Sequence, residues 1–135
     1  KAPKKAKPKR YGHVFVINDA RGRVLLQKRG DKGLYAGMYQ LPTTPWEGQR
    51  IADSKKAFTS SGLSRGEVKL EKTALPEVRH SLTHFDLFLS LHRGKAAKAL
   101  PREGSVWVAV RDFDKYALPT VMRKALVLAL GSGAA

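Results

Sequence analysis

The sequence of 135 residues contains no cysteine. Disulfide bonds, thiolate zinc sites, iron–sulfur ligation and a cysteine nucleophile are therefore excluded within this chain. Long hydrophobic runs are also missing, because residues 125–130 form only a short apolar stretch and a membrane-spanning helix needs about 20 apolar residues. No hydrophobic stretch follows the basic amino end, so a secretory signal is not indicated. We expect a cytoplasmic protein with no membrane contact.

Acidic residues are scarce: 11 Asp and Glu stand against 26 Lys and Arg, which gives a formal net charge of +15. Residues 1–10 carry six of the positive charges and no acid, so nine remain on the rest of the chain. An excess of this size favours a polyanionic partner, and we expect contact with nucleic acid. A solvated basic face without a ligand is the simpler alternative.

Three parts are expected along the chain. Residues 1–10 combine lysines with Pro3 and Pro8 and offer nothing to bury, which is typical of an extended linker. Residues 11–130 are expected to form one domain, because 42% of the chain is hydrophobic and the length suits a single core. Residues 131–135 are expected to be a loose end.

Hydrophobic periodicity predicts the elements of this domain. A β-hairpin is expected at 11–18 and 23–29, followed by a glycine-rich loop at 30–38 and a short helix at 51–61. A long strand is predicted at 78–92, with these residues on one face: Phe85, Leu87, Leu89 and Leu91. Another strand is expected at 106–110. A final helix at 119–130 is predicted to bury Leu118, Val121, Met122, Ala125, Leu128 and Ala129.

This order of elements resembles the Nudix fold, an α/β fold in which a mixed, mostly antiparallel sheet lies between helices as an α/β/α sandwich. Three segments are more specifically similar to the C-terminal domain of MutY-type adenine DNA glycosylases. They are residues 24–42 with the run KGLYAGMYQLP, residues 79–87 with RHSLTHFDL, and Trp107-Val108 together with Ala117-Leu118-Pro119 and Lys124-Ala125-Leu126.

Nudix hydrolases hold divalent cations with a carboxylate-rich helix, and the resemblance places that motif at 51–61. Lys55 and Lys56 stand where an Arg-Glu pair is expected, and Thr59 and Ser60 replace the adjacent pair of glutamates. Hard cations need charged oxygen ligands, and lysines repel them. We therefore expect no hydrolase activity, no catalytic residue and no metal in this chain. A metal triad of His80, His84 and Asp86 is rejected on the spacing of a continuous strand.

The resemblance implies that Leu82, Thr83 and His84 recognise 8-oxoguanine opposite a mispaired adenine. A hydroxyl both donates and accepts hydrogen bonds, so Thr83 suits the altered edge of the oxidised base. Thr83 as an ordinary β-branched strand residue and His84 as a structural histidine are the alternatives. Leu82 departs from the phenylalanine that is usual in the family, although leucine still makes an apolar wedge. The predicted contacts to the DNA backbone are Arg21, Arg23, Lys28, Arg29 and Lys32.

On this interpretation the parent protein is an adenine DNA N-glycosylase that acts in base excision repair, and this chain alone is inactive. The expected partners are double-stranded DNA with an 8-oxoguanine:adenine mispair and the N-terminal glycosylase domain of the same protein, which would hold the iron–sulfur cluster. We expect no cofactor in this chain, a monomer, and association with the nucleoid if the source is bacterial. An active Nudix-type nucleoside diphosphate hydrolase and a basic RNA- or ribosome-binding domain are the alternatives.

Overall fold

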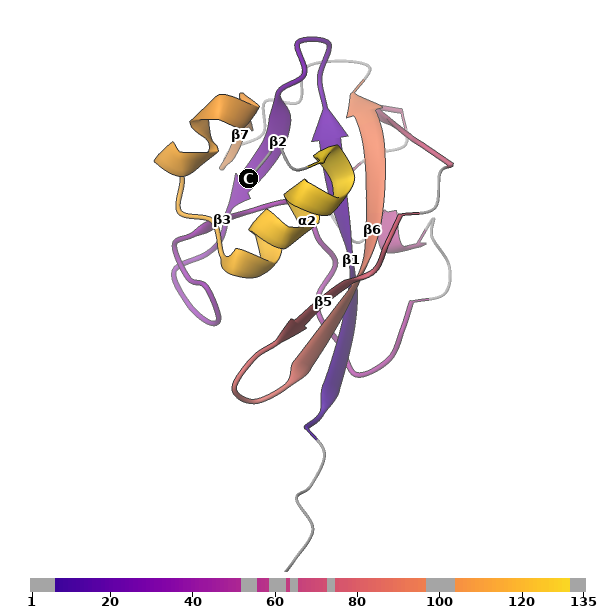
Figure 1. Cartoon of the computed structure of the whole chain (residues 1–135), viewed down its shortest axis with the longest axis vertical. Coiled ribbons are helices and arrows are strands. Elements are labelled where there is room, and N and C mark those ends of the chain that lie inside the picture. Colours follow the sequence, from indigo (N-terminus) through magenta and orange to yellow (C-terminus); the bar gives the residue numbers. More distant parts are fainter. Residues whose placement is uncertain are drawn as a thin grey trace, which may run out of the picture.

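The computed structural model describes residues 7–51, 56–58, 63, 66–72, 75–96 and 104–131. This part of the chain forms a seven-stranded sheet with helix α2 packed across it (Figure 1). The elements are β1 (Lys9–Asn18), β2 (Val24–Lys28), β3 (Tyr39–Gln40), β4 (Val68–Leu70), β5 (Val78–Ser81), β6 (Asp86–Ala96), β7 (Ser105–Val108), the 3-10 helix η1 (Val110–Lys115) and α2 (Thr120–Leu130). No helix in these ranges is long and apolar enough to cross a membrane.

Strands β1 and β6 form the centre of the sheet, in the strand order β3-β2-β1-β6-β4. They run parallel, with Lys9 opposite Asp86 and Asn18 opposite Lys95. The other pairings are antiparallel: β1 with β2, β2 with β3, β2 with β7, β4 with β6 and β5 with β6. The predicted mixed, mostly antiparallel sheet is confirmed.

Both faces of the central strand β1 are buried. This burial explains why residues 14–17 are all apolar. Val14 and Val16 pack on the side of α2, whereas Phe15 and Ile17 pack on the opposite side, in the cluster that contains Phe58. Alternating strand residues point to opposite faces, and a strand covered on both sides has no polar face to show. The sheet therefore has a hydrophobic core on each face, with α2 over the first core and the described helical residues 56–58 over the second.

Helix α2 begins after Pro119, which occupies the N-cap, and ends at Gly131, whose φ of 94° suits glycine. The helix was predicted at these positions and is confirmed. Its buried side chains are Val121, Met122, Ala125, Leu126 and Ala129. The prediction of Leu128 as a core residue is wrong, because it lies just outside the edge of this stripe and is 41% exposed.

The long strand predicted at 78–92 is in fact a hairpin. Strand β5 ends at Ser81, β6 begins at Asp86, and these two residues pair across the turn. The N–H of Leu82 donates to the carbonyl of Phe85 at 2.9 Å and closes the reversal. Alternation on β6 is real, but the turn at 82–85 contains neither glycine nor proline to mark it. The strand predicted at 106–110 likewise ends at Val108, where η1 soon follows.

The predicted boundary between linker and domain also moves. Strand β1 begins at Lys9 rather than at residue 11, and the carbonyl of Pro8 accepts a hydrogen bond from the N–H of Asp86. The register with β6 explains this, because β6 offers partners beyond the apolar run. Residues 1–6 and 132–135 lie outside the described residues. Of the helix predicted at 51–61, only residues 51 and 56–58 are described, and 56–58 are helical.

Candidate nucleic-acid interface

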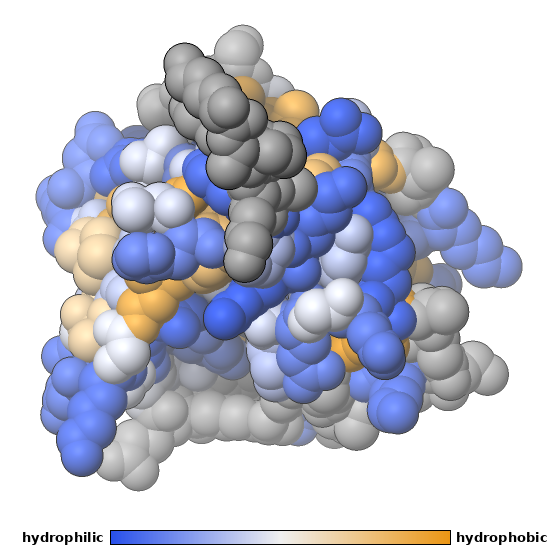
Figure 2. All heavy atoms as spheres, turned by 90° about the horizontal axis from the view of Figure 1, so that it is seen from below, coloured by the Kyte–Doolittle hydropathy of each residue, from blue (hydrophilic) through white to orange (hydrophobic). Residues whose placement is uncertain are grey.

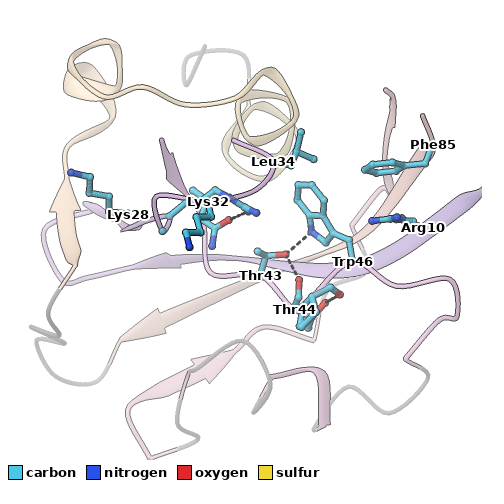
Figure 3. Close-up of a pocket in the computed structure, with 12 residues that line it drawn as sticks. Arg10, Lys28, Lys32, Leu34, Thr43, Thr44, Trp46 and Phe85 are labelled. Atoms are coloured by element: carbon cyan, nitrogen blue, oxygen red, sulfur yellow. Dashed lines mark hydrogen bonds between the residues drawn. The ribbon is translucent and has the colours of Figure 1, made fainter. Parts of the chain in front are cut away.

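A cleft of about 490 Å³ opens where β1 begins and β2 ends (Figure 3). Its lining comprises Arg10, Lys28, Arg29, Gly30, Lys32, Leu34, Gln40, Thr43, Thr44, Pro45, Trp46 and Phe85. Four of these side chains are cationic and none is a carboxylate. In the described part of the chain, none of the four cations forms an ion pair. The charge of the cleft therefore favours an anion over a cation or a neutral ligand.

Trp46 reaches the cleft because its segment runs along β1. Isolated bridges pair Val14 with Thr43 and Tyr11 with Glu47. The indole N–H of Trp46 donates to the Thr43 hydroxyl at 3.1 Å, as Figure 3 shows. A β-carbon at Gly12 would come within 2.7 Å of Trp46 Cδ1, so this close approach requires glycine.

Two guanidinium groups lie over the aromatic rings of the cleft. The Arg29 guanidinium carbon is 5.5 Å from the centre of the Trp46 ring, and that of Arg10 is 4.5 Å from the centre of the Phe85 ring. Arg29 also donates to the side-chain oxygen of Gln40. Burial lowers the pKa of the Arg29 guanidinium, although nearby Tyr35 acts in the opposite direction. A partly desolvated cation over a ring is a favourable place for a phosphate or a base edge.

The three predicted lesion-contacting residues lie in the β5–β6 turn. Thr83 and His84 are exposed, and Leu82 is half-buried. Phe85, the next residue, lines the cleft, so the turn adjoins the cationic surface. Figure 2 views the molecule from this end and shows a mainly hydrophilic face with small hydrophobic patches. Within the described part of the chain, the side chains of Thr83 and His84 form no hydrogen bond or ion pair, and the turn presents them beside the cationic cleft.

Contacts from the segment before β1 hold this turn. The Lys7 amine donates to the Ser81 hydroxyl and to the Leu82 carbonyl, both at 2.8 Å. The Ser81 hydroxyl in turn donates to the Asp86 carboxylate at 2.8 Å, and Lys7 lies 3.8 Å from the same carboxylate. These contacts tie the base of the turn to the amino end of β1.

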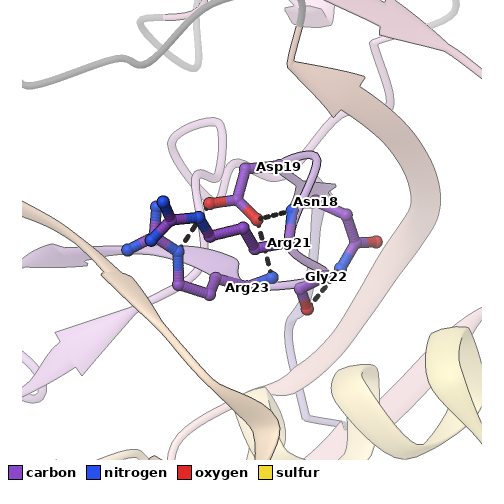
Figure 4. Close-up of polar contacts among 5 residues, drawn as sticks. All are labelled: Asn18, Asp19, Arg21, Gly22 and Arg23. Carbon is purple, nitrogen blue, oxygen red and sulfur yellow. Dashed lines mark hydrogen bonds and ion pairs between the residues drawn. The ribbon is translucent and has the colours of Figure 1, made fainter.

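The predicted backbone contacts separate into two groups. Lys28, Arg29 and Lys32 line the cleft. Arg21 and Arg23 instead belong to the β1–β2 turn, beyond the far end of β1 (Figure 4). A strand of this length spans about 30 Å. The structure therefore brings only the first group together with the β5–β6 turn.

The β1–β2 turn is held by Asp19. Its carboxylate accepts from the N–H groups of Arg21 at 2.9 Å and Arg23 at 2.8 Å, and from the Arg23 side chain at 2.6 Å (Figure 4). Burial alone would raise the pKa of Asp19, but these hydrogen bonds and the Arg23 charge lower it overall. The charge of Arg23 is therefore paired within the turn, although its side chain is still 39% exposed.

Sequence reasoning missed three contributors to this surface. Lys7 and Arg10 were assigned to a linker, and Phe85 was expected only in the core. The strand position of Arg10 could have been predicted, because Arg10 stands just before the apolar run of β1 and strands often extend beyond their buried residues. Trp46 both packs against the core and lines the cleft.

The metal triad of His80, His84 and Asp86 was rejected on the spacing of a continuous strand, which is wrong because β5 and β6 form a hairpin. His80 lies on β5, where its Nδ1 is 3.0 Å from the Lys124 amine, while His84 lies in the turn and Asp86 on β6. Among the described residues, no three His, Asp or Glu side chains gather to hold a metal ion. The hairpin pairs Ser81 with Asp86 and His80 with Leu87, so the spacing of a continuous strand does not apply to these groups.

A family model for the NUDIX domain matches residues 13–128, and the chain therefore belongs to the Nudix family. Among solved structures, the C-terminal domain of mouse MUTYH, in complex with human PCNA, is 20% identical and has a TM-score of 0.62, with 89% of this chain and 86% of that one covered. The MutT protein from Methanosarcina mazei is 16% identical with a TM-score of 0.66, over 90% of this chain and 93% of that one. The NUDIX domain of Shewanella oneidensis NrtR, complexed with ADP ribose, is 11% identical and has a TM-score of 0.67. The match covers 93% of this chain and 87% of that one.

At these identities the structural likenesses show the fold and nothing finer. No curated protein matches the chain.

The metal that Nudix hydrolases use does not fit the residues of this chain. The cleft lining holds four cations and no carboxylate, and the sequence has no acid between Asp53 and Glu67. Of the four positions that depart from the metal-binding motif, Lys55, Thr59 and Ser60 lie outside the described residues. The fourth, Lys56, is exposed on its helical turn. A divalent cation needs several charged oxygen ligands, which this donor set lacks.

Proposed function

We propose that this chain is the DNA-contacting C-terminal domain of a MutY-type adenine DNA glycosylase and that it recognises 8-oxoguanine opposite a mispaired adenine. The observation that carries this proposal is the placement of the β5–β6 turn, whose Thr83 and His84 are exposed beside a cleft of four unpaired cations. The chain would supply binding and selectivity, not the cleavage of a glycosidic bond.

The turn suits the recognition of an oxidised base. 8-Oxoguanine carries an oxygen at C8 and a proton on N7, so its altered edge offers both an acceptor and a donor. The Thr83 hydroxyl serves either, and Leu82, half-buried at the entry of the turn, gives an apolar surface against a base step. Because Lys7 and the Leu82–Phe85 hydrogen bond hold the turn, little order must be gained on binding.

The cleft suits the DNA backbone. Lys28, Arg29 and Lys32 meet phosphates with no competing carboxylate among the lining residues, and such contacts position a duplex without reading its sequence. In this scheme Arg21 and Arg23 contribute only to the general positive field.

The remaining parts of the proposal concern the parent protein. Excision of adenine would belong to an N-terminal glycosylase domain of the same protein, which would also hold an iron–sulfur cluster. The whole would act as a monomer in the cytoplasm, or at the nucleoid in a bacterium. The shared fold with the C-terminal domain of mouse MUTYH supports the proposal that the parent protein acts in DNA repair.

Fluorescence anisotropy with the isolated 135-residue chain tests the proposal. Three matched duplexes would carry 8-oxoguanine:adenine, guanine:adenine or an undamaged pair at the same position. We expect weak, salt-dependent binding to all three, with the 8-oxoguanine duplex bound about fivefold more tightly, the worth of roughly one net hydrogen bond. Equal affinity for all three duplexes at every salt concentration would count against lesion recognition.

An active Nudix hydrolase is the second candidate, favoured by the structural match to the MutT protein from Methanosarcina mazei. Its test is release of pyrophosphate from nucleoside triphosphates, including the 8-oxoguanine form, with magnesium or manganese. The missing carboxylates predict no release. Turnover at roughly 1 per second or faster, an ordinary enzyme rate, would establish the hydrolase and overturn the binding proposal.

A further inference from the structure

A second hollow, of about 470 Å³, lies between β5 and α2, two elements that are neighbours in Figure 1. Its lining comprises Val78, Arg79, Thr120, Arg123, Lys124, Val127 and Leu128. It shares no residue with the cationic cleft, so it forms a separate surface. We call it the β5–α2 groove.

The floor of the β5–α2 groove is apolar. Val78 is buried, Val127 is half-buried, and Leu128 is 41% exposed at the margin. Leu128 and Leu34 are the exposed large hydrophobic residues of the described part of the chain. A single exposed leucine is ordinary, but one that borders a hollow with an apolar floor offers a place for an apolar side chain of a partner.

Three cations surround this floor, and nearby carboxylates compensate them incompletely. Arg79 Nε is 3.6 Å from the Glu77 carboxylate, and Arg123 is 3.4 Å from Asp114, whose side chain is 88% exposed. The Lys124 amine contacts only uncharged acceptors in the described structure, the Arg79 carbonyl and His80 Nδ1. Burial, and then the Lys124 charge, lower the pKa of His80, so this ring does not become a fourth cation near neutral pH.

We infer that the β5–α2 groove docks an acidic, amphipathic segment of a partner protein. An aliphatic side chain of the segment packs into the hollow against Val127 and Leu128, and its flanking carboxylates meet Arg79, Arg123 and Lys124. The positive charge around the groove, together with its apolar floor, indicates which kind of partner binds there. A second copy of this chain would bring like charges together, because each carries a net +15, and a nucleic acid would leave the apolar floor uncovered.

Selection from a random peptide library tests which peptides bind the β5–α2 groove. A random peptide display library is selected on the immobilised wild-type chain in excess duplex DNA and is depleted on Leu128→Ser. We expect the surviving peptides to combine Asp or Glu with Leu, Ile or Phe. The best of them, synthesised, should bind the wild type about tenfold more tightly than Leu128→Ser and shift the amide resonances of Val78, Val127 and Leu128.

Matched variants separate the two halves of the proposal. Leu34→Ser removes the other exposed leucine, outside the groove, and should leave peptide affinity unchanged. Arg79→Gln and Lys124→Glu test the charged rim, and each should weaken binding severalfold and reduce its dependence on salt. Thermal unfolding of every variant shows whether the fold survives, and Arg79→Gln is the safer test because that side chain is 77% exposed.

Several results would overturn the inference. They are a selection in which no peptide family depends on Leu128, enriched peptides without acidic residues, and wild-type dimers that Leu128→Ser abolishes. None of these outcomes bears on the DNA-binding proposal, because Leu128→Ser should bind duplex DNA as the wild type does.

Discussion

The Lys7 amine donates a hydrogen bond of 2.8 Å to the carbonyl oxygen of Leu82, a residue 75 positions further along the chain. The same amine donates to the Ser81 hydroxyl. The basic amino-terminal stretch is therefore not wholly a separate linker, because its end holds the turn that we propose to read DNA. A residue expected to contribute only positive charge has a positional role.

Replacing Lys7 by methionine should loosen the β5–β6 turn, because methionine keeps an apolar stem but donates no hydrogen bond. We expect faster hydrogen exchange at the Leu82 amide and a loss of stability of at most about 1 kcal/mol, since these contacts are solvent-exposed. Lys28→Met, which removes a cation from the cleft, is the matched control. Unchanged exchange at Leu82 in Lys7→Met would show that the turn holds its shape alone.

Thr83→Val tests the proposed lesion contact, because it removes the hydroxyl at an exposed position and keeps the shape. In the full-length parent, the preference for adenine opposite 8-oxoguanine over adenine opposite guanine should fall by about 1 kcal/mol, or fivefold. Thr83→Ser should behave as the wild type. If Thr83→Val keeps the full preference with an unchanged melting temperature, then Leu82, His84 or the main chain reads the lesion.

The two groups of cations should differ in their effect on DNA binding. Lys28→Gln removes a charge from the cleft and should reduce the slope of log affinity against log salt by about 1, as expected for one lost phosphate contact. Arg21→Gln removes an equal charge from the far β1–β2 turn and should change the slope little. Equal slopes for the two variants would place the DNA elsewhere on the surface.

Two neighbouring histidines, His13 on β1 and His92 on β6, predict that acid lowers the stability of the fold. His13 Nε2 donates to the Ile51 carbonyl at 2.8 Å, and His13 Nδ1 lies 2.9 Å from His92 Nε2. Phe15 stacks on the His92 ring at 4.9 Å between centres. Burial first, and then the neighbouring His13, lower the pKa of His92 from 6.5 to about 4.

The folded-state pKa of His92 lies below the unfolded value, so the unfolded chain takes up the proton first as the pH falls. Stability should therefore decline from about pH 6.5 towards pH 4. The full shift would correspond to about 3 kcal/mol, and solvent screening of this incompletely buried ring reduces the expected loss to roughly 2 kcal/mol. His92→Gln keeps an N–H donor but does not titrate, so urea unfolding of this variant should lose less stability over the same range. Parallel pH profiles would assign the acid sensitivity to other groups.

Much of the fold could be predicted from the sequence because its signals are local. Proline and glycine bound α2, and alternating leucines mark β6. The chain reversal between Leu82 and Phe85 was not predicted, because this turn contains neither glycine nor proline. The β5–α2 groove escaped too, since Leu128 at helical spacing was expected to be buried.

The amino-acid sequence by itself determined the fold family, the excess of positive charge and the absence of any acid between Asp53 and Glu67, where the family resemblance places a metal-binding helix. Each of these depends on residue type and on order along the chain. Only the tertiary structure decided which cations act together. Lys28, Arg29 and Lys32 gather in one cleft with Arg10, whereas Arg23 is paired with Asp19 at the far end of β1. The parallel register of β1 and β6 places Arg10 opposite Leu87, next to the β5–β6 turn, and the pairing of β2 with β3 places Lys28. Pairings between distant segments leave no periodic signal in the sequence.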